Sequence, residues 1–312
     1  MTQGDKIKIL ICSNIYPPHF VGGAELIAHN QAMAFKQLGH KVVVFAGDTQ
    51  PLYERHRIRK EEYDGLTVYR VQLYPIDFKT DGINFHNAVV EKHFYNLLRE
   101  YQPQVVHFHN IIGLSAGLIH IAKIHGCKTF ITLHDHWGYC FRNTIMKGNG
   151  PICNNFNDCT NCMQFIYDEN NAVIPAKMRK DYIDLQLQDI DMFISPSQYL
   201  ADSYIQAGFS KEKMKVIWNG IDVEKFSRIK KKNENSNTVR ITYIGHFGKH
   251  KGIHVLLNAL KILKNKELAY INLVGGGEEL DTYKKIIKES NLTAQVRFWG
   301  KIDNKEIGQV YS

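Results

Sequence analysis

The sequence predicts an α/β fold in two units, each built around a mostly parallel sheet. Short, nearly continuous apolar runs alternate with segments of helical periodicity, which is the pattern of parallel strands covered by helices on both faces. The chain has 312 residues, enough for two domains of roughly 100–200 residues each. A polar stretch at 228–237, rich in lysine and asparagine, separates two series of strands and helices.

The first series runs to about residue 220. Its expected strands are 7–12, 42–46, 66–73, 105–109, 129–134 and 192–195, and its expected helices are 24–38, 87–101, 114–125 and 197–207. Gly39, Pro103 and Gly208 follow three of these helices, and both residue types commonly stand just beyond a helix end. We therefore predict a first domain at 1–220.

The second series begins at Val239. Its expected strands are 241–244, 270–274 and 296–299, and its expected helices are 253–260 and 278–290. Asp303 and Glu306 have the spacing of a capping box for one more short helix. Three strands make only half of an open α/β sheet. We therefore predict a linker at 221–238 and a partial second domain at 239–312.

The composition is that of an ordinary globular protein with an excess of basic residues. The formal net charge of +8 favours anionic partners such as nucleotides or a membrane surface, although a solvated lysine-rich surface explains it more simply. The sequence contains no nucleic-acid-binding motif and no apolar run long enough to cross a bilayer. Because no signal-peptide pattern precedes the first strand, we expect a cytoplasmic protein, with peripheral association at the inner membrane face left open.

The strongest chemical signal lies at the start of the second series. An apolar run ends at Gly245, and Gly248 and Gly252 frame Lys249 and Lys251 before a helix begins. Glycines allow close approach of the backbone to a ligand, and a helix N-terminus offers unpaired N–H groups. A diphosphate fits this arrangement. The same lysines without a flanking strand and helix would indicate only a solvated basic turn.

Glycines mark other strand ends as well. Gly275–Gly277 follow the next strand, and Arg297–Lys301 form a third edge whose backbone could contact a nucleobase. In the first series, Gly22 and Gly23 lie between the first strand and helix, where open α/β sheets bind ligands. Their amides could contact a phosphate or a sugar hydroxyl, or the pair could simply serve a tight turn. The spacing is not G-x-G-x-x-G, which argues against a dinucleotide-dependent dehydrogenase.

Histidines lie at two strand ends of the first series. His107 and His109 share one face of their strand, and His134 ends the next one. A single histidine in such a place is more often a hydrogen-bonded structural residue. Two strands that carry them also support a functional interpretation, and we favour His134, Asp135 and His136 over the earlier pair.

Four cysteines cluster in a loop rich in glycine and asparagine. Cys159 and Cys162 form a C-x-x-C pair, and Cys140 and Cys153 could complete four thiolate ligands around a structural zinc ion. Reduced thiols or a redox pair are the alternatives. Four cysteines leave no open coordination position, so no catalytic role follows.

The order of these motifs resembles that of the family 4 glycosyltransferases. The matching segments are Pro17-Pro18, Gly22–Glu25, Val105–His109, Leu133–Asp135, Ser195–Ser197, Val216–Asp222, Gly245–Gly252, Val274–Gly277 and Val296–Gly300. Each is a weak signal alone, but together they occur in the family's order over nearly the whole chain. The resemblance implies a GT-B fold of two Rossmann-like domains that face a cleft.

The resemblance also implies a function, namely transfer of a sugar from a nucleotide-sugar donor, with retention at the anomeric carbon and without a required metal. The acceptor would be a glycan or a lipid-linked molecule in polysaccharide or glycoconjugate synthesis. By position, His134 would contact the transferring sugar and Lys251 the diphosphate. The acceptor side would include Gly22, Gly23, His109 and Asp135, and the donor side Asn219, Gly220, Gly245, His246, Lys251, Gly252, Gly277, Phe298 and Gly300.

The sequence departs from the family pattern in two places. His246 stands where the family usually has an arginine, and a neutral histidine cannot make a bidentate phosphate contact. The family's pair of donor-binding glutamates does not occur before Ser312. We therefore expect a piece of a longer enzyme that is inactive by itself. The alternatives are a sugar-nucleotide epimerase of the same fold and a binding module that uses only the first domain.

Overall fold

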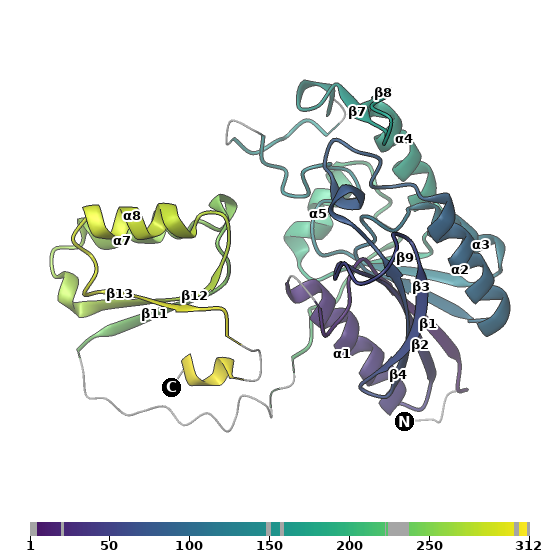
Figure 1. Cartoon of the computed structure of the whole chain (residues 1–312), viewed down its shortest axis with the longest axis horizontal. Helices are drawn as coiled ribbons and strands as arrows, with labels where there is room; N and C mark the ends of the chain where they lie inside the picture. The colour runs from purple at the N-terminus through teal and green to yellow at the C-terminus, as the bar shows by residue number, and fades with distance from the viewer. Residues whose placement is uncertain are drawn as a thin grey trace. The chain divides into compact units, whose positions relative to one another are not determined.

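The structure is a computed structural model that describes residues 5–19, 22–147, 151–156, 159–221, 223, 237–302 and 306–310. The chain divides into two compact units, residues 1–220 and 221–312 (Figure 1). Each unit is an α/β structure with its own apolar core. Most of the predicted linker at 221–238 and Asp303 of the predicted capping box lie outside the described residues.

The first unit contains an eight-stranded sheet in the order β10-β9-β6-β5-β1-β2-β4-β3. The strands are β1 Lys8–Ser13, β2 Lys41–Asp48, β3 Ile58–Tyr63, β4 Leu66–Gln72, β5 Val105–Phe108, β6 Lys128–Thr132, β9 Met192–Ser195 and β10 Met214–Val216. All neighbouring pairs are parallel except β3–β4, which is antiparallel at the sheet edge. β1 is buried along almost its whole length, as a central parallel strand must be.

Helices cover both faces of this sheet (Figure 1). They are α1 Gly23–Gln37, α2 Ala88–Tyr101, α3 Gly117–Ile124, α4 Ala176–Leu187 and α5 Gln198–Gln206. Alternation along β1 sends Ile9 and Ile11 to the cluster that contains Ala28 and Ala32 of α1. Leu10 of the same strand joins the larger cluster on the other face, together with residues of α2 and α3.

Short elements complete the first unit. The 3₁₀ helix η1 spans Pro75–Phe78, and η2 spans Cys159–Asn161. A small antiparallel hairpin pairs β7 Phe165–Tyr167 with β8 Val173–Pro175. None of the described helices is both long and apolar enough to cross a membrane.

The second unit has a three-stranded parallel sheet in the order β11-β12-β13. Its elements are β11 Val239–His246, η3 Lys249–Lys251, α7 Ile253–Ile262, η4 Lys266–Leu268, β12 Ala269–Gly276, α8 Leu280–Glu289, β13 Val296–Gly300 and η5 Ile307–Val310. Phe247, Leu257 and Tyr283 pack with Leu273 in the core between the sheet and α7 and α8. The strand–helix alternation predicted for this unit is confirmed.

Several elements of the first unit escape sequence analysis, namely the short strands β7, β8 and β10 and, more informatively, β3 and α4. β3 is charged at four of its six positions, Arg59–Glu62, and it forms because the backbone of β4 offers a free sheet edge. The apolar residues of α4 do not form one continuous stripe, although Ile183 and Leu187 are buried. Both elements depend on tertiary contacts more than on local pattern.

Candidate functional site

Three histidines form a chain across the ends of β5 and β6. The Nδ1 of His109 lies 2.9 Å from the Nε2 of His134, and their rings stack with centroids 5.2 Å apart. The Nε2 of His107 lies 2.8 Å from the hydroxyl of Thr132. His109 is only 1% exposed, whereas His134 is half-buried at the edge of the sheet. His134 therefore lies between the buried His109 and the surface at the C-terminal end of β6.

The histidine chain is uncharged at neutral pH. Burial lowers the pKa of His107 and of His134 to about 4, and burial with two neighbouring imidazoles lowers that of His109 as well. A neutral His134 can donate or accept a hydrogen bond, but it is not a proton donor of matched pKa near pH 7. Its geometry suits positioning of a polar ligand group.

Asp135 is an ionisable group whose charged form is disfavoured by its surroundings. Burial raises its pKa to about 6, although the Trp137 N–H donates to Oδ1 at 2.8 Å and the buried guanidinium of Arg179 lies nearby. Asn110 donates to Oδ2 at 3.3 Å. Burial also lowers the pKa of Arg179 to about 10. A half-buried carboxylate with a raised pKa beside the histidine chain is typical of functional sites.

The predicted glycine pair lies at the start of α1. The Gly22 N–H donates to the carboxylate of Glu25 at 2.9 Å, so this amide is already occupied in the structure. Gly23 is the first helical residue, and a Cβ there would meet no atom within 4 Å. Glu25 also contributes to the raised pKa of Asp135, so the helix start and the end of β6 belong to one electrostatic environment.

In the second unit, close backbone packing explains the glycines at the ends of β11 and β12. A Cβ on Gly275 would lie 1.9 Å from the carbonyl oxygen of Gly245, and one on Gly277 would lie 2.7 Å from that of Phe247. Both backbones adopt positive φ, 132° and 159°. Only glycine allows these two strand ends to approach so closely.

The predicted diphosphate turn forms a short 3₁₀ helix that leads directly into α7. Lys249 and Lys251 are exposed, and Gly252 adopts φ 75° as the N-cap of α7. The turn therefore presents two ammonium groups beside a helix N-terminus, where N–H groups and the helix dipole favour an anion. The structure brings Gly245, His246, Lys251 and Gly277 to one edge of the second unit.

His246 has a partner that sequence analysis missed. Its Nε2 lies 2.6 Å from Oε2 of Glu278, and both side chains are exposed. The Glu278 carboxylate has a pKa below its usual value because of a backbone hydrogen bond and His246. Glu278 follows the three glycines in sequence, but nothing in its spacing indicates a contact with a residue 32 positions earlier.

The third strand of the second unit ends at the same edge. Phe298 is half-buried against Phe247, with ring centroids 6.3 Å apart, and Gly300 adopts φ 71°. The indole N–H of Trp299 donates to Asn272, and Arg297 stacks over its ring at 3.9 Å. These two contacts fix the Trp299 side chain. A ligand at this end of the strand would therefore contact the backbone that follows Phe298.

Asn219 and Gly220 lie in an exposed segment that follows β10 at the end of the first unit. The Ile217 N–H donates to the Ser195 carbonyl at 2.9 Å, which fixes the start of this segment. The roles predicted for Asn219 and Gly220 at a donor site remain predictions.

The structure does not support the predicted zinc ion. Cys140, Cys153, Cys159 and Cys162 line one small cavity of about 20 Å³. Across the described residues, however, no group of three or more Cys, His, Asp or Glu side chains is arranged to hold a metal. The Cys153 thiol donates to the Asn155 carbonyl at 3.3 Å, and burial raises the pKa of Cys159.

Two family models match the chain. The model described as Glycosyltransferase Family 4 matches residues 21–225, and the model described as Glycosyl transferases group 1 matches residues 224–312. An uncharacterized 41.2 kDa protein in the cps region of Klebsiella pneumoniae is 33% identical over 155 residues, which is 47% of this chain and 40% of that relative. An uncharacterized glycosyltransferase of Methanocaldococcus jannaschii is 21% identical over 98% of this chain and 72% of its own length.

Solved structures show the same fold. Anabaena HepE, crystallised in complex with UDP and glucose, aligns with a TM-score of 0.58 and 18% identity over 97% of this chain and 71% of its own length. At that identity the likeness concerns the fold. The predicted α/β fold of the GT-B type is therefore confirmed.

Proposed function

Because the chain belongs to the glycosyltransferase family 4 and has a GT-B type fold, we propose that it transfers a sugar from a nucleotide-sugar donor to a glycan or lipid-linked acceptor. The observation that carries this proposal is the turn after β11, where Lys249 and Lys251 are exposed directly before the N-terminus of α7 and Gly277 packs against the nearby Phe247. The location of relatives in a cps region supports a role in polysaccharide synthesis.

The proposed reaction breaks the bond between the anomeric carbon and the diphosphate oxygen. The acceptor hydroxyl oxygen forms the new bond on the same face, so that configuration is retained, and its proton passes to the departing diphosphate. Negative charge grows on the diphosphate as the bond breaks. Lys251 and the amides at the start of α7 would stabilise that charge more in the transition state than in the ground state, so no divalent cation is required.

We assign the histidine chain to sugar positioning. His134 would hydrogen-bond a hydroxyl of the transferring sugar, and the buried His109 would hold His134 rather than touch the acceptor. This revises the sequence-based expectation for His109, because a side chain that is 1% exposed cannot reach a ligand directly. Gly22, Gly23 and Asp135 keep their proposed place on the acceptor side.

Release of a nucleoside diphosphate from a panel of UDP-, ADP- and GDP-sugars, with and without a glycan acceptor mixture, tests the proposed function. We expect one nucleotide class to be cleaved in the presence of EDTA, and NMR of the product to show a retained anomeric configuration. Such cleavage would overturn the sequence-based expectation that residues 1–312 are inactive by themselves. Inversion would contradict the assigned stereochemistry. Failure to bind or cleave any of these donors would contradict the proposal itself.

Replacing His134 with alanine should lower kcat/KM for donor cleavage about tenfold, which is the value of one hydrogen bond between neutral groups. The activity of the wild type should not follow His134 titration between pH 6 and 8, because its pKa lies near 4. His125→Ala is a matched control, since His125 hydrogen-bonds its own helix at Ile121. An unchanged kcat/KM in His134→Ala would contradict the assignment of His134 to the site.

Replacing Glu278 with glutamine should tighten nucleoside diphosphate binding by about 2- to 5-fold, in the range expected for an exposed ion pair. The change removes a negative charge from the anion-binding edge and frees His246 for the ligand. Calorimetric titration measures the difference, with Glu289→Gln as the control, because Glu289 pairs with Lys285 on α8. Weaker binding would show that Glu278 itself contacts the donor.

A further inference from the structure

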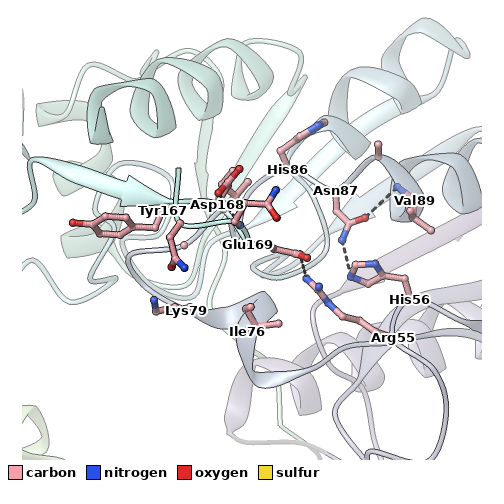
Figure 2. A pocket seen from close by; sticks show the side chains of 15 residues that line it. Arg55, His56, Ile76, Lys79, His86, Asn87, Val89, Tyr167, Asp168 and Glu169 are labelled. Atoms are coloured by element: carbon pink, nitrogen blue, oxygen red, sulfur yellow. Dashed lines mark hydrogen bonds and ion pairs between the residues drawn. The ribbon is translucent and has the colours of Figure 1, made fainter. Parts of the chain in front are cut away.

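A cavity of about 530 Å³ lies in the first unit, apart from the histidine chain. Its walls come from the loop before β3, from η1, from the N-terminus of α2 and from the turn of the β7–β8 hairpin (Figure 2). The hairpin is tied to the opposite wall, since the Tyr167 N–H donates to the Asp81 carbonyl at 2.8 Å. A volume of this size suits a small-molecule ligand, for which about 300–1,000 Å³ is usual.

Arg55 is a fixed cation at this cavity. Its Nη2 and Nε donate to Oδ1 of Asp77 at 2.6 and 3.0 Å. Asp77 is buried, and the Tyr74 N–H donates to its other oxygen at 2.7 Å. The buried carboxylate therefore orients the guanidinium, while a quarter of the Arg55 side chain remains exposed to the cavity.

Glu169 occupies the outer side of Arg55. Its Oε1 lies 2.5 Å from Nη2 of Arg55, yet the Glu169 side chain is 61% exposed at the hairpin turn (Figure 2). Because solvent screens the exposed Glu169 carboxylate, its pairing with Arg55 is weak, so an incoming anion can displace it. Asp77, by contrast, is 3% exposed and stays in place. Glu169 thus marks the position that the anionic group of a ligand would take.

Other groups along the cavity match a charged saccharide. Lys79 and His86 line it, and the hydrogen bond that His86 donates to the Glu91 carboxylate raises the pKa of His86. Asn87 caps α2, so the positive end of that helix dipole also faces this wall. Asn170 and Tyr167 add polar groups of the kind that bind sugar hydroxyls.

We infer that this cavity binds the carboxylate or phosphate group of an acidic saccharide, with Arg55 as its partner once Glu169 is displaced. The inference deepens the proposed function, on which it rests, by making the acceptor an acidic glycan.

Calorimetric titration of the full chain with glucuronate, glucose 6-phosphate and glucose tests the inference. We expect both anionic sugars to bind at least tenfold more tightly than glucose, and the better of the two identifies the charged group. Glu169→Gln should tighten their binding about threefold or more, because the competing carboxylate is removed. Arg55→Gln should weaken it at least tenfold. Asp181→Asn, which breaks the exposed ion pair with Lys177 on α4, should leave the binding of all three sugars unchanged.

Arg55→Gln also removes the hydrogen bonds that Arg55 donates to the buried Asp77, so a thermal unfolding scan must accompany it. Glu169→Gln carries the test independently, because that side chain is exposed. Equal binding of glucose and glucuronate, or weaker binding in Glu169→Gln, would overturn the inference. UDP titration in parallel separates the two proposals: Lys251→Ala should weaken UDP binding and leave glucuronate binding unchanged. If the wild type binds glucuronate but not UDP, only the proposed donor site is contradicted.

Discussion

Replacing Lys251 with alanine is expected to lower kcat/KM for donor cleavage about 100-fold. The ammonium group lies in the turn before α7, where the departing diphosphate would gain negative charge. Removing one preorganised donor to such a charge typically costs about 10²–10³ in rate. Because His246 is paired with Glu278 at 2.6 Å, it is poorly placed to replace the lost cation.

The matched control is Lys285→Ala, which removes an exposed lysine of α8 that pairs with Glu289. Its rate should equal that of the wild type, so that a general loss of positive charge is excluded as the cause. The kcat/KM of Lys249→Ala should lie between those of Lys251→Ala and Lys285→Ala, since Lys249 lies in the same turn as Lys251. Equal rates for Lys251→Ala and Lys285→Ala would contradict the assignment of the diphosphate site.

Replacing Asp135 with asparagine is expected to raise the free energy of unfolding at pH 7 by about 2–3 kcal/mol. Burial raises the pKa of this carboxyl from 3.8 to about 6, and each unit corresponds to about 1.4 kcal/mol. The folded state therefore binds the proton more tightly than the unfolded state does. The contribution of Asp135 to stability is greatest below pH 4 and is lost as the pH rises from about 4 to 6. The gain in Asp135→Asn should accordingly vanish at pH 4.

Urea unfolding at pH 4 and pH 7 measures this difference. Asp181→Asn, an exposed change on α4, should alter stability by less than about 0.5 kcal/mol at either pH. A destabilised Asp135→Asn at pH 7 would mean that the ionised carboxylate is needed by Arg179 and Asn110 for folding. A gain in stability joined to a loss of activity would show that the charge is kept for function.

Much of the fold follows from local sequence. The apolar runs that form β1, β2 and β12 are too short and too continuous for amphipathic helices, and Gly277 directly follows the last of them. β3 and α4 could not be predicted in this way, because one has charged residues in its centre and the other lacks a continuous apolar stripe. Their structure is decided by β4 and by the core that they cover.

The candidate sites were predictable only where a motif is contiguous. Gly245 lies at the end of β11, and Lys251 and Gly252 are adjacent in the turn that follows, so their closeness in sequence predicts a common location. The contact between His246 and Glu278 and the pair formed by Arg55 and Glu169 join residues far apart in sequence. Such contacts depend on which strands and loops become neighbours, and this is set by the sheet order.

The central claim is that the second unit holds the diphosphate of a nucleotide-sugar through the Lys251 turn. Calorimetric titration of the chain with UDP, ADP and GDP and their monophosphates, in EDTA, tests it most directly. The account predicts that one nucleoside diphosphate binds at least tenfold more tightly than its monophosphate, and that Lys251→Ala removes this difference. Equal binding of the diphosphate and the monophosphate, or a difference that persists in Lys251→Ala, would contradict it.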